Sequence, residues 1–267
     1  MKFVTKFAFA FSIFIPLSAF AHKAWLLPSA TVMTQDQWIS VDAAVSNDLF
    51  YFNHVPLKLD NLLITGPDAT ALRPENPFTG KFRNGFDLHL IGNGTYKLAI
   101  VNKNLFASYE MSGEKKRWRG NAEALVNEIP ADAKNLEVYE SLNRIETFVT
   151  AGTPSDTALK PTGKGLELVP VTHPNDLFAG ESAKFRFLLD GKPSAAQKVN
   201  IVPGGSRYRD KQEALELVTD KDGQIAVTWP QAGMYWLEAT ISDANTSVKQ
   251  AKQRKVSYVA TLEVLPQ

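Results

Sequence analysis

Residues 219–229 read Thr-Asp-Lys-Asp-Gly-Gln-Ile-Ala-Val-Thr-Trp, and this stretch decides the class of fold that the chain can adopt. Asp222-Gly223 is a turn pair, because glycine tolerates the positive φ angles that tight hairpin turns require. After the turn, apolar residues stand at 225, 227 and 229, so their side chains share one face of an extended strand. The stretch therefore predicts a hairpin and a strand that packs one face on a core.

Short apolar and aromatic runs of this kind recur along the chain, separated by Gly-Pro, Asn-Gly, Asp-Gly and Pro-Gly-Gly turns. Regular spacing of many short strands is typical of β-sandwiches. The main exception is 120–129, where Ala122, Leu125 and Ile129 stand near helical spacing and Pro130 ends the pattern. We predict an all-β protein of two β-sandwich domains, with one short helix in the N-terminal half.

The boundary between the two domains is predicted from composition. Residues 151–164 are poor in apolar side chains and read as a linker. The N-terminal sandwich then spans 22–150 and the C-terminal sandwich spans 165–267.

The beginning of the chain has the features of a secretory signal. Lys2 and Lys6 precede or flank an apolar run over 7–17, and Ala19-Phe20-Ala21 offers a signal-peptidase site. We predict a signal peptide over 1–21 and a mature protein that begins at His22 in the periplasm, with secretion as the alternative. The run is too short to span a membrane, so no span is expected in the mature chain.

The mature chain would carry 27 basic and 28 acidic side chains and no cysteine. This balance provides no basic surface for nucleic acid. The absence of cysteine rules out disulfides and thiolate metal sites.

An N-terminal histidine is a candidate metal ligand. A free α-amine has a reference pKa of about 7.7–8.0 and an imidazole of about 6.5, so both nitrogens can bind one ion near neutral pH. With one further imidazole, His22 would form a three-nitrogen histidine brace for copper, nickel or cobalt. His54 is the first candidate for the third nitrogen and His89 is the second.

The histidines also fit ordinary roles. His22 can be an arbitrary first residue after cleavage, and His54 stands in a turn-like segment where it can cap or hydrogen-bond. His89 alternates with Leu88 and Leu90, so it is expected on the polar side of a strand. His173 precedes Pro174 at the start of the second domain and is a weak candidate.

Two further segments have alternative interpretations. Residues 48–54 could line a pocket or a partner-facing patch, or bury Phe50 and Phe52 with Tyr51 outward. The basic cluster 115–119 fits a solvated loop, or a site for a phosphate, a carboxylate or a lipid headgroup in which Trp118 and Arg119 combine stacking with charge.

Several strings resemble one family of exported bacterial proteins, the domain-of-unknown-function family number 4198. They are His22-Lys-Ala-Trp25-Leu-Leu-Pro28, Ser46-Asn-Asp-Leu-Phe50-Tyr-Phe-Asn-His54, Gly165-Leu-Glu-Leu-Val-Pro170-Val-Thr-His173 and Trp229-Pro-Gln-Ala-Gly233. The resemblance implies an association with nickel or cobalt uptake and periplasmic handling of transition metals. Asp190-Gly-Lys-Pro193 and the later Asp-Gly turn also resemble immunoglobulin-like or transthyretin-like modules.

Enzyme signatures are mostly absent from the sequence: there is no Gly-x-Ser-x-Gly, no Walker loop, no His-Glu-x-x-His and no cysteine nucleophile. We therefore expect a non-enzymatic periplasmic binding or accessory protein that handles a divalent transition metal for an uptake system. Its partners would be a metal ion or metal chelate and an outer- or inner-membrane uptake component. The alternatives are a surface or receptor-associated interaction module without metal, and a copper monooxygenase of the lytic polysaccharide type.

Overall fold

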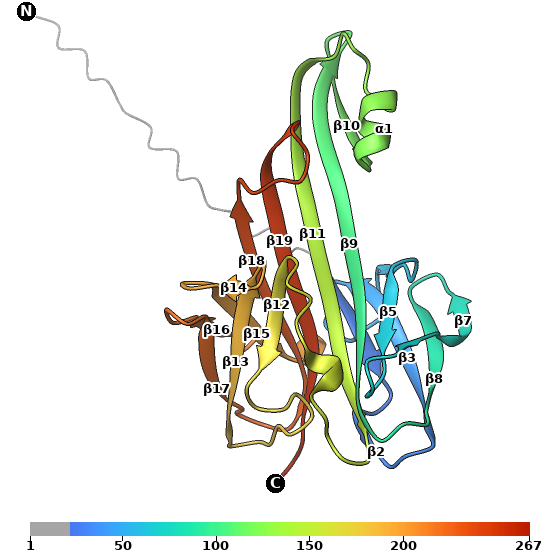
Figure 1. Ribbon diagram of the computed structural model, residues 1–267, viewed down its shortest axis with the longest axis vertical. Helices are drawn as coiled ribbons and strands as arrows, with labels where there is room; N and C mark the ends of the chain where they lie inside the picture. The colour runs from blue at the N-terminus through green and yellow to red at the C-terminus, as the bar shows by residue number, and fades with distance from the viewer. Residues whose placement is uncertain (1–21) are drawn as a thin grey trace, which may run out of the picture.

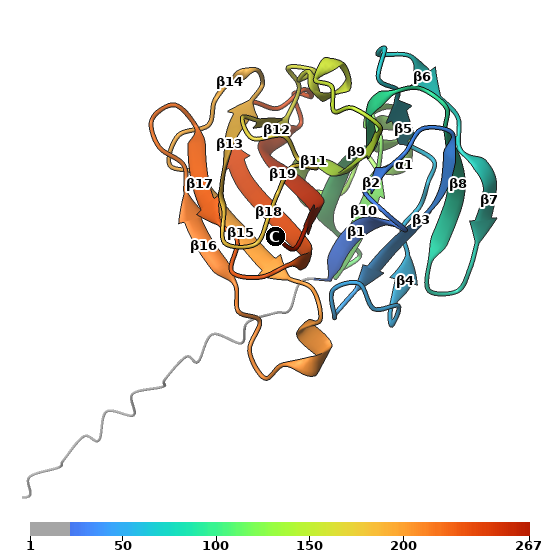
Figure 2. The same ribbon diagram turned by 90° about the horizontal axis from the view of Figure 1, so that it is seen from below.

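The computed structural model describes residues 22–267, so the predicted signal peptide lies outside the described residues. The chain forms three β-sheets stacked as layers (Figures 1 and 2). This arrangement confirms the prediction of an all-β, sandwich-type fold. Over residues 22–267, no helix is long and apolar enough to cross a membrane.

The N-terminal sheet forms one outer layer. It consists, in order, of β1 (Lys23–Pro28), β3 (Gln37–Ser46), β8 (Asn84–Leu90) and β7 (Glu75–Thr79), with β4 (Val55–Pro56) paired to β3. The C-terminal sheet forms the other outer layer, with β12 (Leu166–Pro170), β13 (Ser182–Leu189) and β14 (Lys192–Pro193) in order and β17 (Gln224–Thr228) paired to β13.

The central sheet lies between these layers and has ten strands. Its order is β16 (Leu215–Val218), β15 (Lys198–Pro203), β18 (Gly233–Asp243), β19 (Ala251–Val264), β11 (Lys134–Ala151), β9 (Gly94–Met111), β5 (Leu62–Thr65) and β6 (Ala71–Leu72). In addition, β10 (Glu114–Gly120) pairs with β9, and β2 (Val32–Met33) pairs with β11.

Each face of the central sheet carries one hydrophobic core, because successive side chains on a strand point to opposite faces. On β18, Trp236 belongs to the core under the N-terminal sheet and Leu237 to the core under the C-terminal sheet. Both side chains are buried. The two sandwiches therefore share one sheet.

The sharing depends on a parallel pairing of β11 with β19, which runs from Val138 opposite Ala251 to Thr147 opposite Thr261. Residues 151–164 lead from β11 to the C-terminal sheet and include a short 3-10 turn (Thr157–Leu159). Ala158 and Leu159 in this turn are buried. The halves on either side of 151–164 are thus joined by backbone hydrogen bonds as well as by this connection.

The stretch 219–229 forms its turn but not a hairpin. Ile225, Val227 and Trp229 pack in the C-terminal core, as their alternation predicts. The strands on the two sides of the turn enter different sheets, because β16 pairs with β15 whereas β17 pairs with β13. The Asp222-Gly223 turn therefore carries the chain from the central sheet to the C-terminal sheet.

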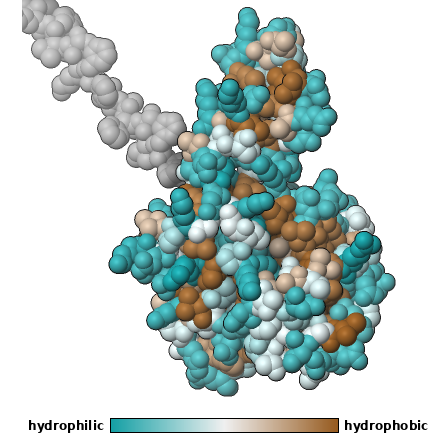
Figure 3. Space-filling model, viewed as in Figure 1, coloured by the Kyte–Doolittle hydropathy of each residue, from teal (hydrophilic) through white to brown (hydrophobic). Residues whose placement is uncertain are grey.

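The far halves of β9 and β11, with β10 and α1 (Ala122–Glu128), extend beyond the three layers as an arm (Figures 1 and 3). Helix α1 lies inside the predicted 120–129 and is capped by Asn121, whose side chain accepts a hydrogen bond from the Ala124 amide. A small third core, built around Leu105, Leu125 and Val138, holds the helix against the strands.

Candidate functional site

His22 and His54 lie side by side. The centroids of their rings are 3.8 Å apart and the ring planes are tilted by 32°. His22 immediately precedes β1 and His54 immediately precedes β4. Both strands pair with the same end of β3, since Lys23 is opposite Ser46 and Val55 is opposite Val45. Two histidines 32 positions apart in sequence are brought together by the pairing of their strands with β3.

The loop between β3 and β4 is held by its own polar groups. The Asn53 side chain donates to Asp48 Oδ2 at 2.9 Å and accepts from the Asn47 amide at 3.2 Å. Ser46 donates to the Asp48 carbonyl at 2.6 Å and accepts from Trp25 Nε1 at 3.1 Å. These contacts fix the position of His54 relative to β1, and no sequence pattern indicates them.

The aromatic residues of this loop pack as the core interpretation predicts. The rings of Phe50 and Phe52 lie 5.6 and 5.2 Å from the buried Trp25 ring. Tyr51 points outward and is covered by the Arg207 guanidinium at 3.9 Å. Phe50 and Phe52 of the aromatic run therefore pack on Trp25, while Tyr51 faces outward.

The charges beside the pair are nearly balanced. Burial lowers the pKa of Lys23, and the carboxylates of Glu238 and Asp48 oppose this shift. Burial raises the pKa of Glu238, and Lys255 and Lys23 oppose it. Lys23 Nζ also lies 5.5 Å from the Trp236 ring centroid.

The donor set of this pair suits a transition metal. Imidazole nitrogens bind copper, nickel and zinc at about 2.0–2.1 Å, so two ligands of one ion lie within about 4 Å of each other. Rings separated by 3.8 Å can meet this condition. Among residues 22–267, no three His, Cys, Asp or Glu side chains form a metal-binding group. A third donor would therefore be the His22 amine, which cleavage after residue 21 would free.

His89 lies at the opposite end of β3. It is opposite Trp38, eight residues from Ser46, which is roughly 26 Å along a strand. Its ring stacks on Trp38 at 4.5 Å, and its Nε2 lies 2.8 Å from Asp36 Oδ1. His89 is therefore too far from His22 and His54 to serve as the third ligand of the same ion.

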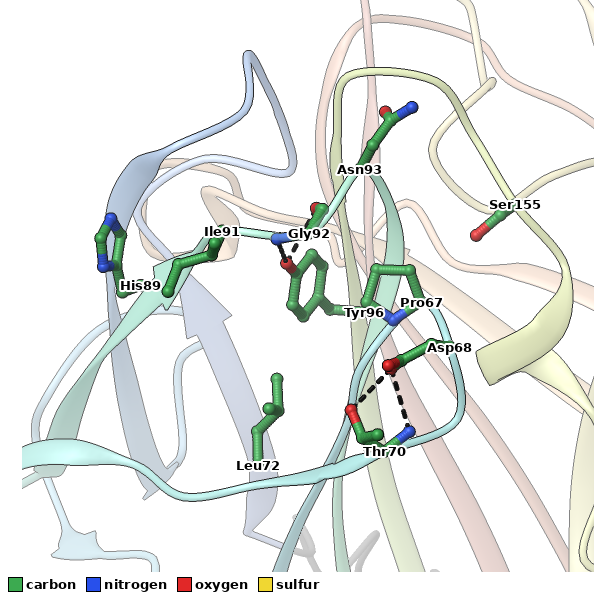
Figure 4. A pocket seen from close by; sticks show the side chains of 10 residues that line it. All are labelled: Pro67, Asp68, Thr70, Leu72, His89, Ile91, Gly92, Asn93, Tyr96 and Ser155. Atoms are coloured by element: carbon green, nitrogen blue, oxygen red, sulfur yellow. Dashed lines mark hydrogen bonds between the residues drawn. The ribbon is translucent and has the colours of Figure 1, made fainter.

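His89 instead lines a pocket of about 440 Å³ (Figure 4). Figure 4 shows two local hydrogen-bonded pairs at this pocket, Tyr96 Oη with the Gly92 backbone and Asp68 with Thr70. Alternation predicts His89 on the polar side of its strand, and the observed placement agrees with this prediction.

His173 is half-buried in a polar network between β9, β11 and the connection that follows β12. Its Nε2 lies 2.9 Å from Thr95 Oγ1, and its Nδ1 accepts a hydrogen bond from the Asn175 amide at 3.2 Å. Burial lowers its pKa, and the carboxylates of Asp156 and Asp176 oppose the shift. The contacts of His173 involve neither His22 nor His54.

This burial predicts that the His173 ring destabilises the fold in acid. A pKa below the unfolded value of about 6.5 means that the unfolded chain binds the proton first, so stability falls as pH drops below about 6.5. Urea midpoints at about pH 7.5 and about pH 5.5 should differ less in His173→Gln than in the unmodified protein. An unchanged difference in His173→Gln would contradict the prediction.

The basic cluster 115–119 occupies the edge strand β10 of the arm. Trp118 does not stack with Arg119: its Nε1 donates to Glu128 on α1 at 2.8 Å, and the ring packs on the small third core. Arg119 instead covers Phe106 on the neighbouring strand, at 5.4 Å from the ring centroid. Phe106 is not close to Arg119 in sequence, so the sequence alone does not indicate this contact. The pairing of β10 with β9 provides it.

The fold and the histidine pair define a sandwich-type β protein with an exposed two-imidazole site. The family model described as a domain of unknown function, DUF4198, matches residues 19–243. The chain therefore belongs to this family.

The comparison with curated proteins gives no match. Among solved structures, the D0-D1 domain of Intimin is similar, with 11% identity, a TM-score of 0.21, and coverage of 90% of this chain and 97% of that chain. Three N-terminal domains of the Hoc outer capsid protein of bacteriophage RB49 give 12% identity, a TM-score of 0.21, and coverage of 92% and 99%.

Proposed function

We propose that this protein is a non-enzymatic periplasmic binding protein that carries a divalent transition metal to an uptake system. The α-amine and imidazole of His22 and the imidazole of His54 would hold the ion. The observation that carries the proposal is the 3.8 Å separation of the two rings, which belong to segments far apart in the chain. We call these three nitrogens the His22–His54 claw.

The chemistry of the claw favours copper, nickel or cobalt as cargo. All three donors are nitrogen, and among first-row divalent ions nitrogen sites bind copper(II) most tightly. Both histidines are exposed, which supports release of the ion to a partner on the same surface. The rigid loop before β4 limits the entropy that His54 loses on binding, because its neighbours are already hydrogen-bonded.

The test compares a mature chain that begins at His22 with one that carries an added Met before His22. Titration calorimetry should show micromolar or tighter binding of Cu(II) or Ni(II) to the first form and much weaker binding to the second. His54→Ala should weaken binding by at least about tenfold, since even outer-shell changes at metal sites cost this much. His89→Ala is the matched control and should bind as the parent chain does.

Equal affinity of the two chain forms would remove the amine from the site. Mass spectrometry of the exported chain tests whether its first residue is His22. Reductant-dependent peroxide formation with oxidised sugar products would instead favour a copper monooxygenase. A protein that binds no metal but retains a partner from the periplasmic fraction would favour an interaction module.

A further inference from the structure

A pocket of about 620 Å³ lies where the arm meets the segment that joins β4 to β5. Its lining comprises Pro56 at the end of β4, Leu57, Lys58, Asp60 and Asn61 from that segment, and Asn102, Asn104 and Arg119 from β9 and β10. We call it the arm pocket. Its volume is within the range of small-molecule sites.

Arg119 is the best-fixed charged group of the arm pocket. Its Nε donates to Asn104 Oδ1 at 3.2 Å, and its guanidinium covers the Phe106 ring. Phe106 in turn stacks on Tyr139, with centroids 5.0 Å apart and planes tilted by 7°. Arg119, Phe106 and Tyr139 are direct neighbours across β10, β9 and β11. Because Nε and the ring face are engaged, the two terminal nitrogens remain for a bidentate ligand.

The lining offers more hydrogen-bond donors than acceptors. Arg119 Nε can only donate, so Asn104 must present its oxygen to Arg119, and its amide nitrogen remains free to donate. Asn102 likewise accepts a hydrogen bond from Asn61 Nδ2 at 2.9 Å, and its own amide nitrogen remains free to donate. In the described part of the chain, neither of these nitrogens donates to a protein atom.

The net charge of the lining is positive, so it favours the same acceptor-bearing ligands as the excess of donors does. Lys58 and Arg119 are cationic, and Asp60 is the acidic residue of the lining. A ligand that complements the pocket must bring oxygen acceptors and negative charge. A carboxylate does both, and a guanidinium fork with adjacent amide donors is the arrangement that binds it bidentately.

The arm pocket begins close in the chain to the histidine pair. Pro56, which lines it, is two residues after His54 and pairs with Ala44 on β3. We propose that the arm pocket binds a carboxylate of a small organic acid, and that this acid is a chelator that accompanies the ion held by His22 and His54. The second half rests on the function proposed above; the carboxylate site itself does not.

The experiment measures binding of two probes, citrate and tricarballylate, to the mature protein by NMR titration. Tricarballylate has the three carboxylates of citrate but lacks the hydroxyl group through which citrate chelates metals. Without metal, both acids should bind the unmodified chain, and Arg119→Gln should weaken both by at least about tenfold because it removes charge-assisted hydrogen bonds. Arg117→Gln is the matched control: Arg117 lies two residues away on the same exposed strand, outside the pocket.

Ni(II) distinguishes a free acid from a chelator. With Ni(II) bound, citrate affinity should rise several-fold while tricarballylate affinity should not, and His54→Ala should abolish that rise and leave metal-free binding intact. No binding of either acid up to about 10 mM, or equal losses in Arg119→Gln and Arg117→Gln, would overturn the carboxylate site. Equal effects of Ni(II) on the two acids would overturn the chelator assignment. If Cu(II) still binds the claw in those cases, the function proposed above stands independently.

Discussion

Replacing Arg144 with methionine is expected to lower the free energy of unfolding by about 3–5 kcal/mol, the cost of breaking a buried ion pair by removing one partner. Arg144 lies on β11, and its Nη1 donates to Glu146 Oε1 at 3.0 Å. Its Nη2 donates to Thr162 Oγ1 at 3.1 Å and lies 3.5 Å from Glu167 Oε1. The side chains of Arg144, Glu146 and Glu167 are 8%, 4% and 4% exposed, so the two carboxylates have little contact with water that could compensate for the lost guanidinium.

The matched control is Arg254→Met. Arg254 is as buried as Arg144, but the side chains of its partners Asp190 and Asp243 are 33% and 25% exposed. Solvent can reach these carboxylates, so the control should lose less stability. Urea unfolding of the two variants measures both losses of unfolding free energy. An Arg144→Met loss no larger than that of Arg254→Met would contradict the explanation. Adding Glu146→Gln to Arg144→Met should recover part of the loss, because it removes one unpaired charge.

The second large effect is expected at Gly223, where φ is 74°. A Cβ at this position would lie 2.5 Å from the Phe187 carbonyl oxygen and 3.0 Å from the Ser194 amide nitrogen. Both neighbours are backbone atoms of the C-terminal sheet and its hairpin, so neither can turn away. Gly223→Ala should therefore cost about 1–2 kcal/mol for the left-handed conformation and a further 1–3 kcal/mol for the clash.

Gly163→Ala separates these two costs. Gly163 has the same φ of 74°, and a Cβ there would meet nothing within 4 Å. It should lose only the conformational part, which thermal unfolding of the two variants can measure. Similar losses at both positions would show that β13 yields to the added methyl group.

The sequence predicts which face of a strand is buried more successfully than which sheet the strand joins. Alternation at 225, 227 and 229 correctly places Ile225, Val227 and Trp229 in a core. The same stretch does not show that β16 and β17 separate after the turn, because strand partners are chosen by packing across the whole molecule. Only the pairing pattern reveals that the two sandwiches share their middle layer.

The candidate site shows the same division. The proposed chemistry of His22 and His54 can be read from the chain, since a histidine that the predicted cleavage would place at the N-terminus and a second imidazole suffice to suggest a chelate. Their proximity depends on β1 and β4 pairing with one end of β3, and the distance of His89 depends on the register of β8. Likewise, the Arg119 partner is the Phe106 of an adjacent strand, while the nearby Trp118 faces the other way.

The parallel pairing of β11 with β19 has a consequence for how the molecule is assembled. Residues 138–147 and 251–261 are neighbours in space although more than a hundred positions separate them. Closing so large a loop costs entropy before the contacts return it, so slow, late formation of the middle layer is expected. Neither outer layer can finish burying its apolar face until β11 and β19 have paired. The protein should therefore gain its compact state in one concerted step.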